Sequence, residues 1–141
     1  MRWLGLGVLL ALAGGCTRGT GDGPAEVKWD RDTCRSCGMV LSDHDFAAQV
    51  RGGPKDEVQK FDDIGCAVTW LSKQAWADDA ATRIWVEKWG GGGVWLDART
   101  ARYVEGKTSP MGFNFGAVEP GQAGLSFDEV KAKVLAGKAA H

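Results

Sequence analysis

The chain has 141 residues and a formal net charge of −1, from 17 basic and 18 acidic side chains. This length fits one domain, or two small halves that share a core, and the balanced charge gives no electrostatic support for a nucleic-acid partner. Hydrophobic residues make up 44% of the chain, which is enough for a core. Most of the seven tryptophans should pack in that core or line a partner surface.

Residues 1–15 have the features of a bacterial export signal. Arg2 supplies a positive charge, residues 3–13 form an apolar stretch too short to span a bilayer, and small residues precede Cys16. The stretch 12–16 resembles the lipobox of bacterial lipoproteins, in which the cysteine is lipid-modified. Cleavage at the small residues of an ordinary secreted protein is the alternative. We therefore expect a domain on the periplasmic side of the cell envelope, attached through lipid on Cys16.

The residue after this cysteine bears on the destination. Thr17 stands where an aspartate would retain a lipoprotein at an inner membrane, which favours the outer membrane. Residues 16–28 contain the lipidated cysteine and a segment rich in Gly, Thr and charge, which predicts a flexible tether. The folded domain is expected over residues 29–141.

The first part of this domain reads as strands around one helix. Alternating apolar residues predict strands, and a Gly-Gly-Pro-Lys-Asp turn joins two of them. Asp62 and Asp63 stand at the N-cap of a helix whose apolar residues recur with helical spacing up to Ala75. The expected strands are 26–29, 46–50, 58–61 and 83–89, followed by a flexible loop of four glycines at 90–93.

The second part repeats this order. Short strands are expected at 95–97, 101–104 and 112–118. A capping box that begins at Ser126 opens a final helix through Leu135. The repetition predicts an internally duplicated α+β fold of two small, similar halves, at 29–93 and 94–141, that share a core.

The chemistry of the chain is concentrated in Cys34-Arg-Ser-Cys37-Gly-Met39. This stretch places two thiols and a thioether close together, and soft sulfur donors select Cu(I), Zn(II) or iron–sulfur clusters. A second sulfur-bearing turn, Ser-Pro-Met-Gly, contains Met111. We expect the fold to bring the two stretches together around one soft metal ion.

Several kinds of site use a Cys-x-x-Cys pair. Structural zinc normally requires a second such pair or histidines, and the two histidines are His44 and the terminal His141. A thioredoxin-like site requires a helix after the pair, where Gly38 instead follows directly. A disulfide between Cys34 and Cys37 would close a very small loop and stabilise little. Cu(I), which accepts two or three soft ligands, fits the donors best.

Other residues have both a structural and a functional interpretation. Cys66 on the first helix is either a buried inert thiol or a ligand. His44 is either a solvated loop residue or an imidazole ligand, since it lies near the cysteine pair in sequence. Asp62 and Asp63 are helix caps, or hydrogen-bond partners of metal ligands.

The order of these motifs resembles that of the NosL family over nearly the whole chain. The matching stretches are Cys34-x-x-Cys-Gly-Met39, Phe61-Asp-Asp-Ile-Gly-Cys66, Ala101-x-Tyr-Val104 and Ser109-Pro-Met-Gly112. The resemblance implies a periplasmic copper-binding lipoprotein that supplies Cu(I) for assembly of nitrous oxide reductase, with a fold of two ββαβ-type halves. It also implies a metal site of Cys34 or Cys37 together with Met111. Which cysteine binds, and whether Met39 joins, stays open.

The sequence therefore predicts a Cu(I) metallochaperone that carries one ion and is not an enzyme. Nitrous oxide reductase is the expected acceptor, with envelope assembly proteins as further candidate partners, no nucleic acid, and membrane contact through the lipid alone. The alternative is an envelope thiol–disulfide oxidoreductase that uses Cys34 and Cys37. A mercury-handling protein shares the same thiol chemistry and is a third interpretation.

Overall fold

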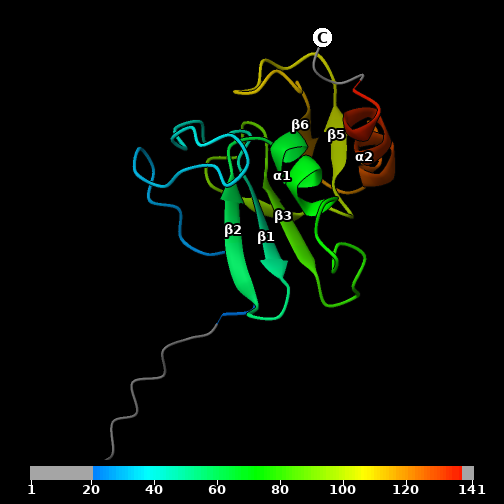
Figure 1. Ribbon diagram of the computed structural model, residues 1–141. Coiled ribbons are helices and arrows are strands. Elements are labelled where there is room, and N and C mark those ends of the chain that lie inside the picture. The colour runs from blue at the N-terminus through cyan, green and yellow to red at the C-terminus, as the bar shows by residue number, and fades with distance from the viewer. Residues whose placement is uncertain (1–20, 138–141) are drawn as a thin grey trace, which may run out of the picture.

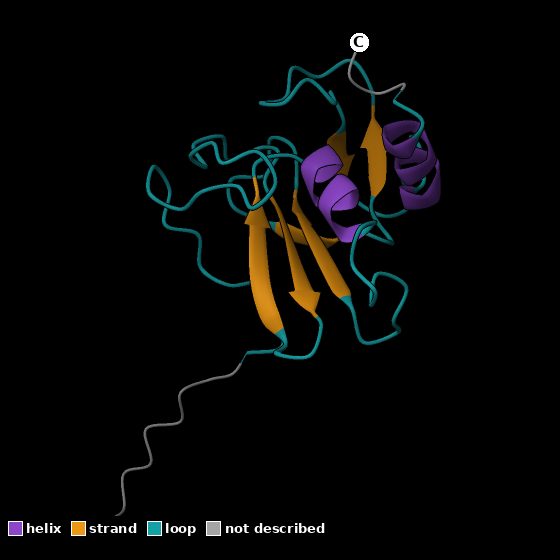
Figure 2. Ribbon diagram, viewed as in Figure 1, coloured by secondary structure: helices purple, strands orange, loops and turns teal. Residues whose placement is uncertain are grey.

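The computed structural model describes residues 21–137, so the predicted signal sequence and Cys16 lie outside the described residues. Within them the chain forms a four-stranded antiparallel sheet of order β2-β1-β3-β4, a two-stranded antiparallel sheet of β5 and β6, and two helices (Figures 1 and 2). The predicted α+β class is confirmed. The elements are β1 (Ala48–Gly52), β2 (Glu57–Phe61), α1 (Ile64–Leu71), β3 (Arg83–Glu87), β4 (Trp95–Asp97), β5 (Arg102–Val104), β6 (Gly116–Val118) and α2 (Phe127–Leu135).

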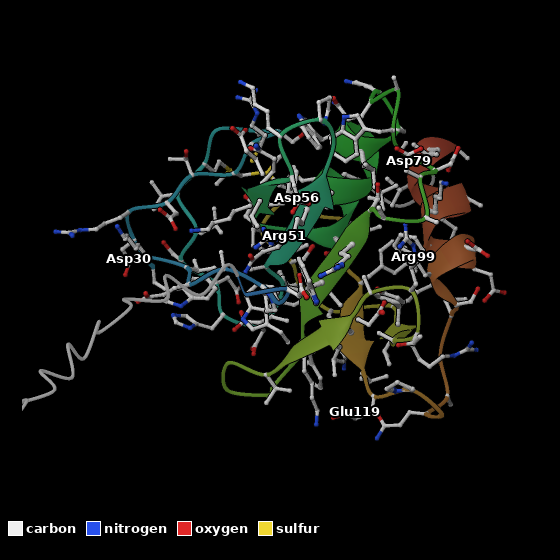
Figure 3. All side chains as sticks on the ribbon, turned by 90° about the horizontal axis from the view of Figure 1, so that it is seen from below. Asp30, Arg51, Asp56, Asp79, Arg99 and Glu119 are labelled. Atoms are coloured by element: carbon white, nitrogen blue, oxygen red, sulfur yellow. The ribbon has the colours of Figure 1, made fainter. Side chains whose placement is uncertain are left out.

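The larger sheet is built on the central strand β1. Val50 pairs with Gln59 of β2 and with Ile84 of β3, and both Val50 and Ile84 are buried in the core. At the closed end of the β1–β2 hairpin Arg51 and Asp56 form an ion pair, with Nη1 and Oδ2 3.8 Å apart (Figure 3). The open end of the hairpin, where Phe61 of β2 leads into Asp62, lies at the opposite end of the two strands from this turn (Figure 1).

Helix α1 begins at its predicted N-cap. The Asp63 side chain accepts a hydrogen bond from the Gly65 N–H at 3.2 Å, and the apolar residues of the helix face the core. The helix ends at Leu71, four residues before the predicted end, because the polar residues after Ser72 continue as turns. These turns place Trp76 against the backbone of the β1–β2 hairpin at Gly52.

The second helix packs beside the first and covers the small sheet (Figure 1). Its capping box is as predicted: Ser126 Oγ accepts from the Glu129 N–H at 3.2 Å, and Glu129 accepts from the Ser126 N–H at 2.7 Å. A cleft of about 410 Å³ lies between the two helices, lined by apolar side chains and by charged ones such as Asp79 and Arg99 (Figure 3).

The two predicted halves differ in their last element. The first follows the order β1-β2-α1-β3, whereas among the described residues the second contains β5, β6 and α2 without a following strand. Strand β4 has its predicted bounds and falls after the boundary at residue 93, yet it pairs with β3 of the larger sheet, Trp85 opposite Asp97. Among the described residues the order ββα is therefore common to both halves, and only the first half has a strand after its helix.

Two predicted strands differ most from the structure, and others, such as those expected at 46–50 and 83–89, differ by two residues at one or both ends. Residues 26–29 form no strand; the backbone nearby is held by the fully buried Gln49, whose amide bonds the N–H and C=O of Ala25 at 2.8 and 2.9 Å. Arg51 also donates to the Gly21 carbonyl at 3.2 Å, so the described part of the predicted tether lies against the sheet. The strand expected at 112–118 is shortened to β6, because residues 109–115 form a loop.

Among residues 21–137 no helix is both long enough and apolar enough to cross a bilayer.

Candidate metal centre

Four side chains from two separate segments meet at the open end of the β1–β2 hairpin. The thiols of Cys34, Cys37 and Cys66 and a carboxylate oxygen of Asp62 all lie within 4.8 Å of one another. The three cysteines are free thiols, so the disulfide considered from the sequence is not formed. The cluster is largely enclosed, since Cys34, Asp62 and Cys66 are buried and Cys37 is partly exposed.

A tight turn presents Cys34 and Cys37 on the same side. The Gly38 N–H bonds the Cys34 carbonyl at 2.9 Å, and Gly38 has a φ of 77°, which favours glycine. The Cys34 N–H in turn bonds the Met39 carbonyl at 2.7 Å, and the Arg35 N–H bonds the Lys60 carbonyl of β2 at 2.8 Å. The pair therefore stands on a turn fixed to the sheet, and no helix follows it, as predicted.

The junction between β2 and α1 supplies the other two donors. Asp62 directly follows β2, and Cys66 lies in the first turn of α1. The Cys37 thiol donates to Asp62 Oδ2, with the sulfur and oxygen 3.3 Å apart. Asp62 is only 3% exposed, and its Oδ1 is buried without a hydrogen-bond partner. An unpartnered buried carboxylate oxygen is costly, and a bound cation would satisfy it.

The thiols of the cluster are electrostatically unequal. The pKa of Cys34 is lowered to about 6, first by a hydrogen bond from the Cys66 thiol and then by the backbone N–H groups of Cys37 and Asp62. Burial raises the pKa of Cys37 to about 12, and its neighbours Cys34 and Asp62 act in the same direction. The pKa of Cys66 is raised by its hydrogen bond to Cys34 and by burial. The shifts favour a Cys34 thiolate that accepts from the Cys66 thiol, beside a Cys37 thiol that donates to Asp62; a metal ion would replace the protons of the thiols that bind it.

This donor set fits a soft or borderline metal ion. Ligands of a tetrahedral zinc–thiolate site, with bonds of about 2.3 Å, stand about 3.8 Å apart, and the four donors here all lie within 4.8 Å of one another. The sequence argument against zinc was the lack of a second cysteine pair. The structure supplies Cys66 and Asp62 in its place, so this argument no longer holds. Cu(I) would use two or three of the same sulfurs.

The loop that carries Met111 packs on the segment that supplies Asp62 and Cys66. The Met111 N–H bonds Asp63 Oδ2 at 3.4 Å, and the ring of Phe113 covers Gly65. The Met111 side chain is partly buried and packs against the hydrophobic core. This loop, between β5 and β6, and the cysteine turn both lie at the end of the molecule opposite the β1–β2 turn (Figure 1).

Two candidates stand apart from the cluster. The side chain of Met39 is 48% exposed, and only its carbonyl takes part in the cysteine turn. The imidazole of His44 stacks on Trp29, with ring centroids 3.8 Å apart, and is not one of the clustered donors. Sequence reasoning assigned Asp62 to a cap or a supporting role. Asp62 stands four residues before Cys66, a spacing that could have indicated that the two side chains reach the same site.

A comparison with curated proteins finds no match for this chain. The comparison with protein families matches NosL over residues 25–132, which include every clustered donor and Met111. The chain therefore belongs to the NosL family.

Proposed function

We propose that this protein is a Cu(I) metallochaperone of the cell envelope that delivers copper for assembly of the copper centres of nitrous oxide reductase, and that it is not an enzyme. The observation that carries the proposal is the buried thiol–carboxylate cluster at the open end of the β1–β2 hairpin. Membership of the NosL family supports copper as its cargo. Three thiols suit Cu(I), which prefers thiolate and thioether over oxygen donors.

The unequal exposure of the thiols suits a protein that must release its ion. Cys34 and Cys66 are buried, at 2% and 4% exposure, whereas Cys37 is partly open to solvent. A donor from the acceptor protein would approach from the side of Cys37 and join the copper ion before Cys37 leaves. On leaving, the Cys37 thiolate would take up a proton, such as the one that an incoming thiol releases on binding copper. The resulting Cys37 thiol would again donate to the Asp62 carboxylate, as it does in the metal-free protein. Copper would then pass by ligand exchange without free ion.

Cu(I) titration of the reduced, full-length chain against a competing chelator tests the proposal. Cys16 is replaced by serine in every sample, because its thiol would bind copper non-specifically. We expect one tightly bound Cu(I), weakened by Cys34→Ser and by Met111→Leu. Met39→Leu is the matched control, since it removes an exposed thioether and should leave the affinity unchanged. No competition with the chelator would refute copper binding, and a parallel Zn(II) titration would show whether zinc uses the same donors.

An envelope thiol–disulfide oxidoreductase is the second candidate. The lowered pKa of Cys34 favours it, because a thiolate is the nucleophile in disulfide exchange. The turn after Cys37 weighs against it, since no helix dipole acts on the pair. Met111→Leu separates the two, because it should weaken copper binding and leave disulfide reduction unchanged. Competition between Hg(II) and Cu(I), with an assay for carbon–mercury cleavage, tests the mercury-handling alternative.

We also propose attachment to the membrane through lipid on Cys16. Arg51 and Arg83, on the half of the sheet away from the cluster, bond the backbone of Gly21 and Asp22 at 3.2 and 2.7 Å. The described chain therefore begins at the closed end of the hairpin, and the cluster lies at the opposite end (Figure 1). An anchor at Cys16 would leave the metal centre facing away from the membrane. Metabolic labelling with a fatty acid, lost in Cys16→Ser, tests the attachment.

A further inference from the structure

Asp63 is a helix cap with more hydrogen bonds than a cap requires. Its Oδ1 accepts from the Gly65 N–H at 3.2 Å, which is the capping bond. Its Oδ2 accepts from the Ser109 hydroxyl at 2.5 Å and from the Met111 N–H at 3.4 Å. Asp63 is fully buried, and an uncharged cap such as serine would avoid the cost of burying a carboxylate. The hydrogen bonds of Oδ2 therefore require an explanation other than helix capping.

The loop that Asp63 holds has its own fixed shape. The Asn114 N–H bonds Ser109 Oγ at 2.8 Å, and the Ser109 N–H bonds Asn114 Oδ1 at 3.2 Å, so the two residues close the loop reciprocally. Asn114 has a φ of 65°, a conformation that asparagine tolerates better than most residues. The Ser109 hydroxyl accepts from Asn114 and donates to Asp63. The closed loop is thus bonded to the start of α1 through one side chain.

A second contact fixes the loop in the same place. The Phe113 ring lies where a Cβ of residue 65 would be, so only glycine at this position lets the ring approach the helix. Asp63 and Gly65 flank the helix start between Asp62 and Cys66, two of the clustered donors. Met111 lies between Ser109 and Phe113. Both contacts therefore fix its position relative to the clustered donors.

We infer that Asp63 is a positioning residue of the copper site: through Ser109 and the Met111 backbone, its Oδ2 holds the Met111 thioether against the clustered donors. This inference deepens the proposed function and rests on it. A thioether is a weak neutral donor, so its contribution to affinity depends on being held in place before the ion arrives. The Asp63 carboxylate thus fixes two donors relative to each other: Cys66 through the helix cap and Met111 through the loop.

A double-mutant cycle on Cu(I) affinity tests this inference, with Cys16→Ser in the full-length chain throughout. Ser109→Ala removes the bond to Asp63 and leaves the helix cap intact. Loss of a hydrogen bond to a charged group predicts a Cu(I) affinity about tenfold weaker. In the Met111→Leu background the same Ser109→Ala change should have no further effect, because the thioether it positions is absent. Asp63→Asn, which retains an oxygen for the cap, should behave like Ser109→Ala.

A metal-free measurement separates positioning from general loosening. In Ser109→Ala we expect the Met111 methyl signal in NMR to move towards its unstructured position and to narrow. The methyl signal of the exposed Met39 is the internal control and should not change. A merely structural role of Asp63 would not produce a response confined to Met111.

The outcomes distinguish this inference from the proposed function. Absence of Cu(I) binding by the unsubstituted chain would overturn both. Binding that needs Met111 but is unaffected by Ser109→Ala would overturn the role of Asp63 alone. Equal losses from Ser109→Ala with and without Met111 would also overturn it, since the effect would then act elsewhere. Unchanged affinity in Met111→Leu would overturn it as well, by removing the group to be positioned.

Discussion

The Cys37 thiol donates to Asp62 Oδ2 across 3.3 Å, which joins the cysteine turn to the junction between β2 and α1. The other oxygen of the same carboxylate is buried without a partner. A bound metal ion would replace the thiol proton that Asp62 Oδ2 now accepts. It would also give the unpartnered Oδ1 a positively charged partner. In Asp62→Asn we expect metal affinity to fall about tenfold, because a charge is lost and a buried amide must be accommodated. Titration with Cu(I) and with Zn(II) measures this, and an unchanged affinity for both would remove Asp62 from the site.

The lowered pKa of Cys34 should depend on Cys66. The largest cause of this lowering is the hydrogen bond from the Cys66 thiol, so Cys66→Ala should raise the pKa of Cys34 from about 6 towards the ordinary thiol range. Thiolate absorbance in the ultraviolet, followed against pH, measures the change. Cys66→Ser is the matched variant, because a hydroxyl can still donate and should retain part of the effect. A Cys34 titration that is the same in all three proteins would contradict the assignment.

Proton release on metal binding should report which thiols become ligands. At neutral pH Cys34 is largely a thiolate already, whereas the raised pKa values of Cys37 and Cys66 keep both protonated. If Cys34 and one further thiol bind Cu(I), about one proton is released per ion. Calorimetry in buffers of different ionisation enthalpy measures the number. If proton release disappears in Cys37→Ser or in Cys66→Ser, the residue replaced in that variant is the second ligand. Zero release in the unsubstituted chain would refute a two-thiolate site.

Stability should fall with rising pH because of Asp63. Burial raises the pKa of Asp63 from 3.8 to about 6, so the folded protein binds this proton more tightly than the unfolded chain. The resulting contribution is present below pH 4 and is lost as pH rises to about 6, by about 2–3 kcal/mol. Urea unfolding of the metal-free chain at pH 4.5 and pH 7 tests this. Asp63→Asn should lose this contribution and keep the part that comes from other groups such as Glu87, whose pKa burial raises to about 7. The exposed Asp79→Asn should retain both contributions, and the same slope in both variants would contradict the assignment.

Gly65 should not tolerate alanine, although alanine normally favours a helix. The added Cβ meets the Phe113 ring, so the ring and its loop must move. We expect Gly65→Ala to destabilise the protein by about 1–3 kcal/mol, as overpacking of a core does. In the Phe113→Ala background the same change should become neutral or stabilising, by up to about 1 kcal/mol. Thermal unfolding of the four proteins measures the coupling, and a loss that persists without Phe113 would place its cause elsewhere.

Local signals accounted for much of the fold. The Ser126 capping box, the Asp63 cap and the bounds of β4 could be read from the sequence, because each depends on neighbouring residues. The pairing of β4 with β3 could not, since the register depends on the whole sheet. Nor could the placement of residues 21–28, which depends on the buried amide of Gln49 more than twenty positions away.

The cysteine pair of the candidate metal centre was easier to predict than its full set of donors. The cysteine turn stood out because sulfur atoms are rare in this chain, and Met111, singled out for the same reason, stays a predicted ligand. Cys66 and Asp62 had plausible structural roles, as a core thiol and a cap, and only the fold shows that they meet Cys34 and Cys37. Met39 shares its motif with the cysteines but faces solvent, because the turn that gathers the two thiols directs the next side chain outward.

X-ray absorption at the copper edge of the Cu(I)-loaded chain shows which donors bind the ion. We expect a shell of two or three sulfur atoms that loses a scatterer in Cys34→Ser and changes in Met111→Leu. A shell dominated by nitrogen or oxygen, or a sulfur shell that is the same in both variants, would contradict this expectation.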